Sequence, residues 1–180
     1  MKPVRVALLL GLAGALTFAA TPAAAQHPQV RKGFWFNIGF GYGSLGCNDC
    51  GTRTGGISGG LSLGGTLSPH LLLGVGTTGW TKSENGATLT VGTLDARIRF
   101  YPAPAGGFFL TAGIGLGSAK VGLSGLGSAS ETGGGAVLGL GYDFRVGRMT
   151  SITPYVNAFG VKTSNTDANV IQAGISVTLH

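Results

Sequence analysis

Charged residues are scarce in this sequence: they make up 10% of its 180 residues, with 12 Lys and Arg against 6 Asp and Glu. The positive excess is small and scattered, which argues against a nucleic-acid partner. Histidine occurs three times and cysteine twice, and neither a His-Glu-x-x-His motif nor a second Cys-x-x-Cys pair supplies a metal site. The sequence therefore predicts a protein that is not an enzyme and has no metal, no cofactor and no catalytic residues.

Long hydrophobic runs are missing beyond the N-terminus, which leaves no candidate for a membrane-spanning helix. Lys2 and Arg5 precede an uncharged apolar stretch over residues 6–15, and alanines at 23–25 fit a cleavage site. This pattern predicts a bacterial secretory signal peptide. The expected organisation is a signal peptide over residues 1–25, a short periplasmic lead-in over residues 26–32 and a single domain over residues 33–180.

Glycine, in contrast, is abundant, with 35 residues. In residues 33–43 (GFWFNIGFGYG) a large apolar residue stands at every second position, and glycine fills most positions between them. Such alternation is typical of a β-strand with one apolar face, and glycine on the second face suits a crowded interior better than a solvated surface. The stretch extends roughly 25–30 Å at about 3.3 Å per residue, which matches the apolar band of an outer-membrane barrel. We interpret it as a transmembrane strand whose aromatic side chains face lipid.

Further segments along the chain show the same alternation. An even number of antiparallel strands with polar turns is the pattern of an outer-membrane barrel, and closure removes free sheet edges. The sequence therefore predicts an all-β fold: a closed, eight-stranded, antiparallel up-and-down transmembrane β-barrel. We expect a bulge or a change of environment near Gly92 and a local irregularity at Pro154. The expected strands are residues 33–43, 56–67, 71–82, 88–101, 107–118, 131–144, 149–161 and 169–179.

With both termini in the periplasm, the short turns are periplasmic and the remaining connections are extracellular. The expected extracellular segments are residues 44–55, 83–86, 119–130 and 162–168. Aromatic residues gathered at strand ends are typical of interfacial girdles. The expected girdles contain Phe34, Phe36, Phe100, Tyr101, Phe108, Phe109, Tyr142 and Phe144 at the periplasmic end, and Tyr42 and Trp80 at the other.

Five charged residues fall on inward-facing positions in the periplasmic half of the predicted barrel. The interior of an eight-stranded barrel is just wide enough for side chains, and an unpaired buried ion is costly. We expect a structural ion-pair cluster that plugs the lumen, with a gate or an ion path as the alternative. The cluster consists of Asp95, Arg97, Arg99, Asp143 and Arg145.

Cys47 and Cys50 fall in the first expected extracellular segment. The residues after them are not helical in pattern, so a redox Cys-x-x-Cys with a lowered thiol pKa is not favoured. Because export favours oxidation, we expect a small disulfide between them rather than two free thiols.

Beyond the signal peptide, the pattern of four segments resembles the small eight-stranded outer-membrane barrels of the OmpA and OmpX type, the outer membrane protein beta-barrel domain group. The resemblance implies a place in the outer membrane of a Gram-negative-type bacterium and contact with lipid and lipopolysaccharide. It also implies assembly by periplasmic chaperones and the barrel-assembly machinery. Such barrels usually end on an aromatic residue, whereas this sequence ends on Leu179-His180, which implies either less efficient assembly or a variant assembly signal. The segments are GFWFNIGFGYG (33–43), LGGTLSPHLLLGVG (63–76), RIRFYP (97–102) and LGLGYDFRVG (138–147).

We therefore expect a non-enzymatic outer-membrane protein with a structural or surface-interaction role, acting through its extracellular loops on an unknown partner. One alternative is a soluble secreted or periplasmic barrel that binds an apolar ligand in its centre, and another is a narrow channel. The first two hypotheses differ in the direction of the large apolar side chains, which point outward in a membrane barrel and inward in a soluble one.

Overall fold

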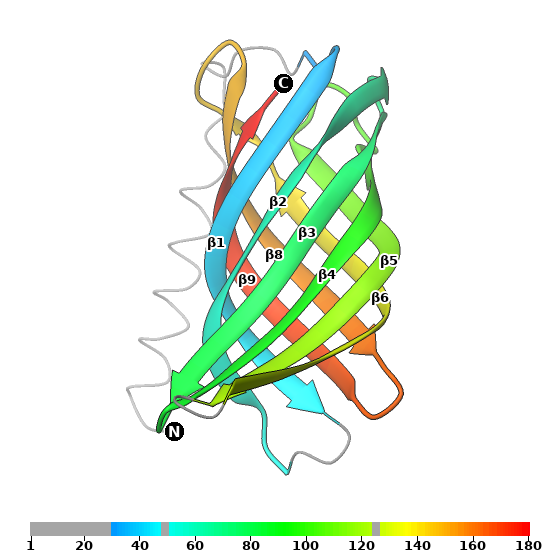
Figure 1. Ribbon diagram of the computed structural model, residues 1–180. Helices are drawn as coiled ribbons and strands as arrows, with labels where there is room; N and C mark the ends of the chain where they lie inside the picture. Colours follow the sequence, from blue (N-terminus) through cyan, green and yellow to red (C-terminus); the bar gives the residue numbers. More distant parts are fainter. Residues whose placement is uncertain (1–29, 48–50, 124–126) are drawn as a thin grey trace, which may run out of the picture.

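Consecutive long strands of the protein pair antiparallel, and the first strand pairs with the last (Figure 1). β1 (Phe34–Cys47) pairs on one side with β2 (Thr54–Ser68) and on the other with β9 (Asp167–Leu179), which closes the sheet. The predicted closed, eight-stranded antiparallel barrel is confirmed. The other elements are β3 (Leu71–Glu84), β4 (Ala87–Phe100), β5 (Phe108–Leu123), β6 (Gly127–Tyr142), the short β7 (Phe144–Arg145) and β8 (Thr150–Lys162).

The computed structural model describes residues 30–47, 51–123 and 127–180. Within these ranges, no helix is long and apolar enough to cross a membrane. The predicted signal peptide and most of the predicted lead-in lie outside the described residues, so both stay predictions. We refer to the end of the barrel that holds the C-terminus as the periplasmic end, in line with the predicted topology (Figure 1).

The large apolar side chains of the strands point away from the barrel axis. In β1, Phe40 and Tyr42 are 76% and 65% exposed, whereas Trp35, on the other face of the same strand, is fully buried. Ile114 in β5 is 75% exposed. An outward apolar surface is what contact with lipid requires. The orientation predicted from the first strand is confirmed, and the soluble alternative, which needs these residues in the interior, is not supported.

Three of the aromatic residues predicted in the girdles point into the lumen instead. Tyr101, Phe109 and Trp80 are each at most 2% exposed. Their place near a strand end is correct, but the alternation gives each an inward position. The aromatic residues that do face outward at the periplasmic end are Phe34, Phe36, Phe100, Phe108, Tyr142 and Phe144, of which Phe36 is only partly exposed.

The segment predicted as a loop over residues 119–130 is largely strand. β5 continues to Leu123 and pairs with the start of β4, where Ala119 lies opposite Val91. β6 begins at Gly127, directly opposite Leu123. The prediction was wrong because Gly and Ser were taken as loop residues, whereas the existing ladder with β4 extends the hairpin regardless of composition.

The two predicted irregularities have different outcomes. Near Gly92 there is no bulge, because the register of β4 with both neighbours runs unbroken; what changes is the environment, since the inward side chain of Val91 is apolar. Pro154 does interrupt the hydrogen-bond ladder between β8 and its neighbours β6 and β7. β6 ends at Tyr142, and β7 resumes the same register with β8 after the position opposite Pro154, which has no N–H to donate.

Candidate functional site in the barrel lumen

Side chains from every part of the barrel fill its lumen in successive layers. Towards the extracellular end, a packed apolar layer forms around Trp80. Towards the periplasmic end, aromatic side chains and charged groups are interleaved. Between them lies a small polar cavity of about 30 Å³. The apolar layer consists of Leu45, Trp80, Val91, Val137, Phe159, Val161, Ala168 and Val170.

Asp95 and Arg97 form a buried ion pair on β4. They stand two positions apart on the strand, so both side chains point inward. Arg97 Nε donates to Asp95 Oδ1 at 2.8 Å, and Arg97 Nη2 donates to Asp95 Oδ2 at 2.7 Å. Thr78 Oγ1 on β3 accepts a further hydrogen bond from Nη2 at 2.8 Å. The bidentate geometry is the stronger form of this interaction and fixes the guanidinium plane.

Glycines on the neighbouring strands make room for this pair. A Cβ at Gly76 of β3 would lie 2.6 Å from Arg97 Cζ, and a Cβ at Gly113 of β5 would lie closer still to the Asp95 carboxylate. Trp80 lies against Gly43 and Gly56 in the same way. The inward glycines, which were predicted to line a crowded interior, therefore leave the space that the large lumen side chains occupy.

Asp143 is the centre of a second network at the periplasmic end, in the break between β6 and β7. Its Oδ1 accepts from Thr153 at 2.7 Å, and its Oδ2 accepts from Tyr101 at 2.8 Å. Arg31 Nη2 and His180 Nε2 lie 3.9 and 3.4 Å from Oδ2. The Asp143 side chain is fully buried, so these contacts replace its hydration.

Arg31 reaches the network from the segment that precedes β1. Its guanidinium donates to the carbonyls of Pro104 and Gly106 at 2.8 and 2.7 Å and lies 3.5 Å from the centre of the Tyr101 ring. With only 3% of its surface exposed, Arg31 lies buried at the periplasmic mouth of the lumen.

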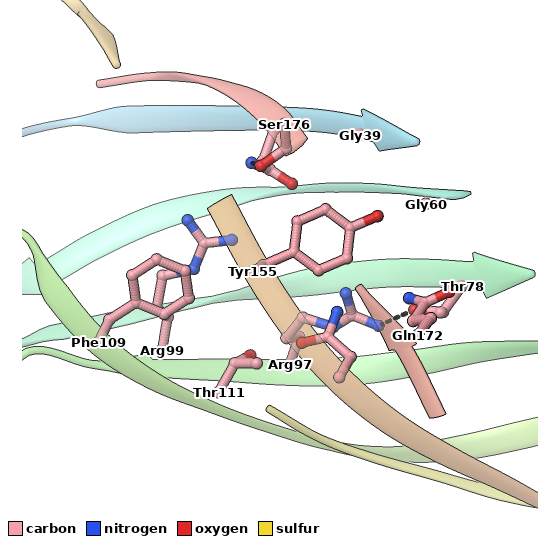
Figure 2. A pocket seen from close by; sticks show the side chains of 12 residues that line it. Gly39, Gly60, Thr78, Arg97, Arg99, Phe109, Thr111, Tyr155, Gln172 and Ser176 are labelled. Atoms are coloured by element: carbon pink, nitrogen blue, oxygen red, sulfur yellow. Dashed lines mark hydrogen bonds between the residues drawn. The ribbon is translucent and has the colours of Figure 1, made fainter. Parts of the chain in front are cut away.

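Arg99 differs from the other buried cations because its described contacts are mainly with rings. Its Cζ lies 4.2 Å from the centre of the Phe109 ring and 5.0 Å from that of Trp35. Its Nε and Nη1 are buried and have no hydrogen-bond partner among the residues that the structure describes. Figure 2 shows Arg99 beside Phe109 at the cavity, with Arg97 hydrogen-bonded to Thr78.

All five charged residues predicted in the lumen are buried there, at most 6% exposed. Asp95 and Arg97 are brought together, whereas Arg145 donates to the carbonyls of Val30 and Arg148. Sequence reasoning missed Arg31, Tyr101 and His180. The signal was present, because continuing the inward alternation of β1, β4 and β9 beyond the strand ends reaches these positions.

Of the predicted disulfide, only Cys47, the last residue of β1, is among the described residues. Cys50 lies outside them, so the pairing stays a prediction.

Two serines of β2 occur in Gly-x-Ser-x-Gly patterns, at Ser58 and Ser62. In hydrolases this motif positions the nucleophile in a sharp turn between a strand and a helix. Here both serines lie within a regular strand and point inward, at 3% and 1% exposure. The pattern reflects the glycine-rich inward face and gives no support for a hydrolase.

Replacing Tyr101 with Phe should remove one donor from Asp143 and keep the ring that stacks under Arg31. A hydrogen bond to a charged group contributes about 1.5–3 kcal/mol, so we expect a loss of that size in the free energy of unfolding. Urea titration of the purified barrel in detergent micelles, followed by tryptophan fluorescence, measures it. An unchanged urea midpoint would show that the phenol contributes nothing to holding the carboxylate.

Comparisons with known proteins agree with this architecture. The family model described as outer membrane protein beta-barrel domain matches residues 10–178. Curated protein sequences give no match. Among solved structures, Neisserial surface protein A (NspA) is similar with a TM-score of 0.62 and 13% identity, over 83% of this chain and 98% of that chain.

Ail of Yersinia pestis is similar with a TM-score of 0.61 and 12% identity, over 83% of this chain and 100% of that chain. The N-terminal barrel of OprF from Pseudomonas aeruginosa gives a TM-score of 0.50 and 12% identity over the same shares. At these identities the structures support the fold alone, whereas the family model covers most of the sequence. The chain belongs to the outer membrane protein beta-barrel domain family and is an integral protein of the cell outer membrane.

Proposed function

We propose that this barrel is a non-enzymatic protein that serves envelope structure or contact with a partner outside the cell through its extracellular loops, and that side chains plug its lumen. The observation that carries the proposal is the filling of the lumen at two levels. The apolar layer around Trp80 lies towards one end, and the network of Asp143 with Arg31 lies at the other. Four of the five predicted lumen charges, Asp95, Arg97, Asp143 and Arg145, are held by specific hydrogen bonds, which supports a structural plug rather than a gate or an ion path.

Hydrogen bonds between strand ends support a shaped extracellular surface. Glu131 accepts from Thr163 at 2.6 Å and from Asn165 at 2.8 Å, which ties the connection between β8 and β9 to β6. Arg53 donates to Asn169 Oδ1 at 2.7 Å and to the carbonyl of Ser44. A surface whose parts are already ordered loses less entropy on binding.

The charges at this end suggest a partner of mixed character. Ail was crystallised in complex with the heparin analogue sucrose octasulfate. In this chain, cationic and anionic groups nearly balance at the described extracellular ends, which favours a partner that is not a polyanion. These groups are Arg53, Lys82, Lys120 and Lys162 against Glu84, Glu131 and Asp167.

We further propose that lipid and lipopolysaccharide surround the barrel and that periplasmic chaperones and the barrel-assembly machinery insert it. The outward apolar belt supports the lipid contacts.

Two measurements test the function. Planar bilayers containing the purified barrel should show no single-channel steps, and discrete steps would favour the channel hypothesis.

In a strain that lacks the protein, the wild type should restore resistance to detergent and adherence to a cell layer. A variant with residues 163–166 replaced by Gly and Ser should restore resistance only. Full adherence of that variant would place the contact elsewhere, and normal resistance of the deleted strain would remove the envelope role.

A further inference from the structure

We propose that the polar cavity in the middle of the lumen binds a small monovalent anion of chloride size. This inference does not depend on the role of the loops. The first argument is the balance of side-chain charge. Among the residues that the structure describes, four guanidinium groups are buried in the barrel and only two side-chain carboxylates are buried with them. These are Arg31, Arg97, Arg99 and Arg145 against Asp95 and Asp143.

The second argument is the state of Arg99. Arg97 is neutralised by a bidentate contact with Asp95. Arg99, in contrast, has two buried N–H groups for which the described part of the chain provides no acceptor. The faces of Phe109 and Trp35 compensate a buried cation only in part. Asp143 supplies part of the counter-charge of Arg99, but its oxygens accept from Thr153 and Tyr101. A desolvated N–H group without an acceptor is costly, and an anion in the cavity would remove that cost.

The third argument is the lining of the cavity. Arg97 and Arg99 both border it, and no carboxylate does. Two carboxamides and the Tyr155 hydroxyl supply further donors, and Gly39 and Gly60 provide the room. The Asn37 amide, which also borders the cavity, already donates to Ser176 and Thr178. The cavity measures about 30 Å³, and one water needs at least about 10–15 Å³ by this measure. The space suits one halide ion or about two waters and is too small for phosphate or sulfate. The two carboxamides are Asn157 and Gln172.

The fourth argument is seclusion. The apolar layer around Trp80 lies on the extracellular side of the cavity, and Arg31 lies at the periplasmic mouth. An ion held there is shielded from water, which strengthens its attraction to the two guanidinium groups.

The test is the dependence of stability on chloride. The full barrel in detergent micelles is unfolded with urea at increasing chloride concentration, with gluconate keeping the ionic strength constant. A ligand that binds only the folded state lowers the unfolding equilibrium constant by a factor of 1 + [L]/Kd, about tenfold at ten times Kd. We expect a saturable rise of the urea midpoint with chloride. Identical midpoints in chloride and gluconate would overturn the proposal.

Two variants separate the cavity from general salt effects. Arg99→Gln should lose the chloride dependence, whereas Arg148→Gln, which removes an exposed charge outside the cavity, should keep it. A chloride effect that survives in Arg99→Gln would also overturn the proposal.

Crystals of the wild type grown in bromide provide a readout that does not need the Arg99 variant to fold. We expect an anomalous peak in the cavity next to Arg99. An anomalous map without that peak would show that the cavity holds only water.

Discussion

Replacing Asp95 with Ala should destabilise the barrel by about 3–5 kcal/mol, because it leaves the Arg97 guanidinium buried without its partner. The pair is bidentate, with its shortest contact at 2.7 Å, and the Asp95 side chain is fully buried. The glycines at positions 76 and 113 fit the space to these two side chains, so little rearrangement can rescue Arg97. The free energy of unfolding in urea, with tryptophan fluorescence as the signal, measures the effect.

The chain contains a matched control for this experiment. Lys82 and Glu84 also stand two positions apart on a strand, and their charged atoms are also 2.7 Å apart, but the pair is exposed. Exposed ion pairs contribute little because water and salt screen them. Glu84→Ala should therefore change the urea midpoint hardly at all. Equal losses in Asp95→Ala and Glu84→Ala would show that burial of the Asp95–Arg97 pair has no energetic consequence.

The double variant Asp95→Ala with Arg97→Met separates the net contribution of the pair from the cost of a stranded charge. Removing both ions leaves no uncompensated buried group, so the double variant should lose less than Asp95→Ala alone. A loss equal to the sum of the two single variants would mean that the residues act independently.

The barrel and its inward face could be predicted from the sequence because both follow from a period of two. Once Phe40 and Tyr42 are assigned to lipid, the side on which Asp95, Arg97 and Arg99 lie follows from counting positions along each strand. The ends of the strands were harder to predict from the sequence. Gly and Ser after residue 118 suggest a loop, but pairing with β4 is a tertiary effect that overrides local composition.

The partners within the lumen could not be predicted in the same way. Parity shows that Asp143 and Arg99 point inward, but it does not show which strands face each other across the barrel. The contact of Asp143 with Arg31 joins residues far apart in the sequence, and it depends on the tilt and stagger of the closed sheet. The apolar layer was missed for a related reason: its members are single inward residues on separate strands, and they become a cluster only when the barrel closes.

Replacing Trp80 with Ala should cost about 3–5 kcal/mol, the range for truncating a large aromatic residue in a packed core. Trp80 is 1% exposed, lies in the apolar layer and donates its indole N–H to the carbonyl of Gly43 at 3.0 Å. The glycines at positions 43 and 56 lie against its ring, so neighbouring side chains cannot fill the space that the ring leaves. Urea unfolding measures the loss, with Trp35 remaining as the fluorescent reporter.

Trp80→Phe is the appropriate control, because it keeps an aromatic ring and removes the hydrogen bond. It should lose much less stability than Trp80→Ala.

The same variants also test the proposed plug in planar bilayers, where Trp80→Phe should show no single-channel steps. In the proposed plug the network of Asp143 and Arg31 is a second barrier at the periplasmic end. Trp80→Ala alone should therefore remain without single-channel steps, and steps should require the additional change Arg31→Ala. Conductance in Trp80→Ala alone would mean that the apolar layer is the only barrier in the lumen and that the charged network is permeable.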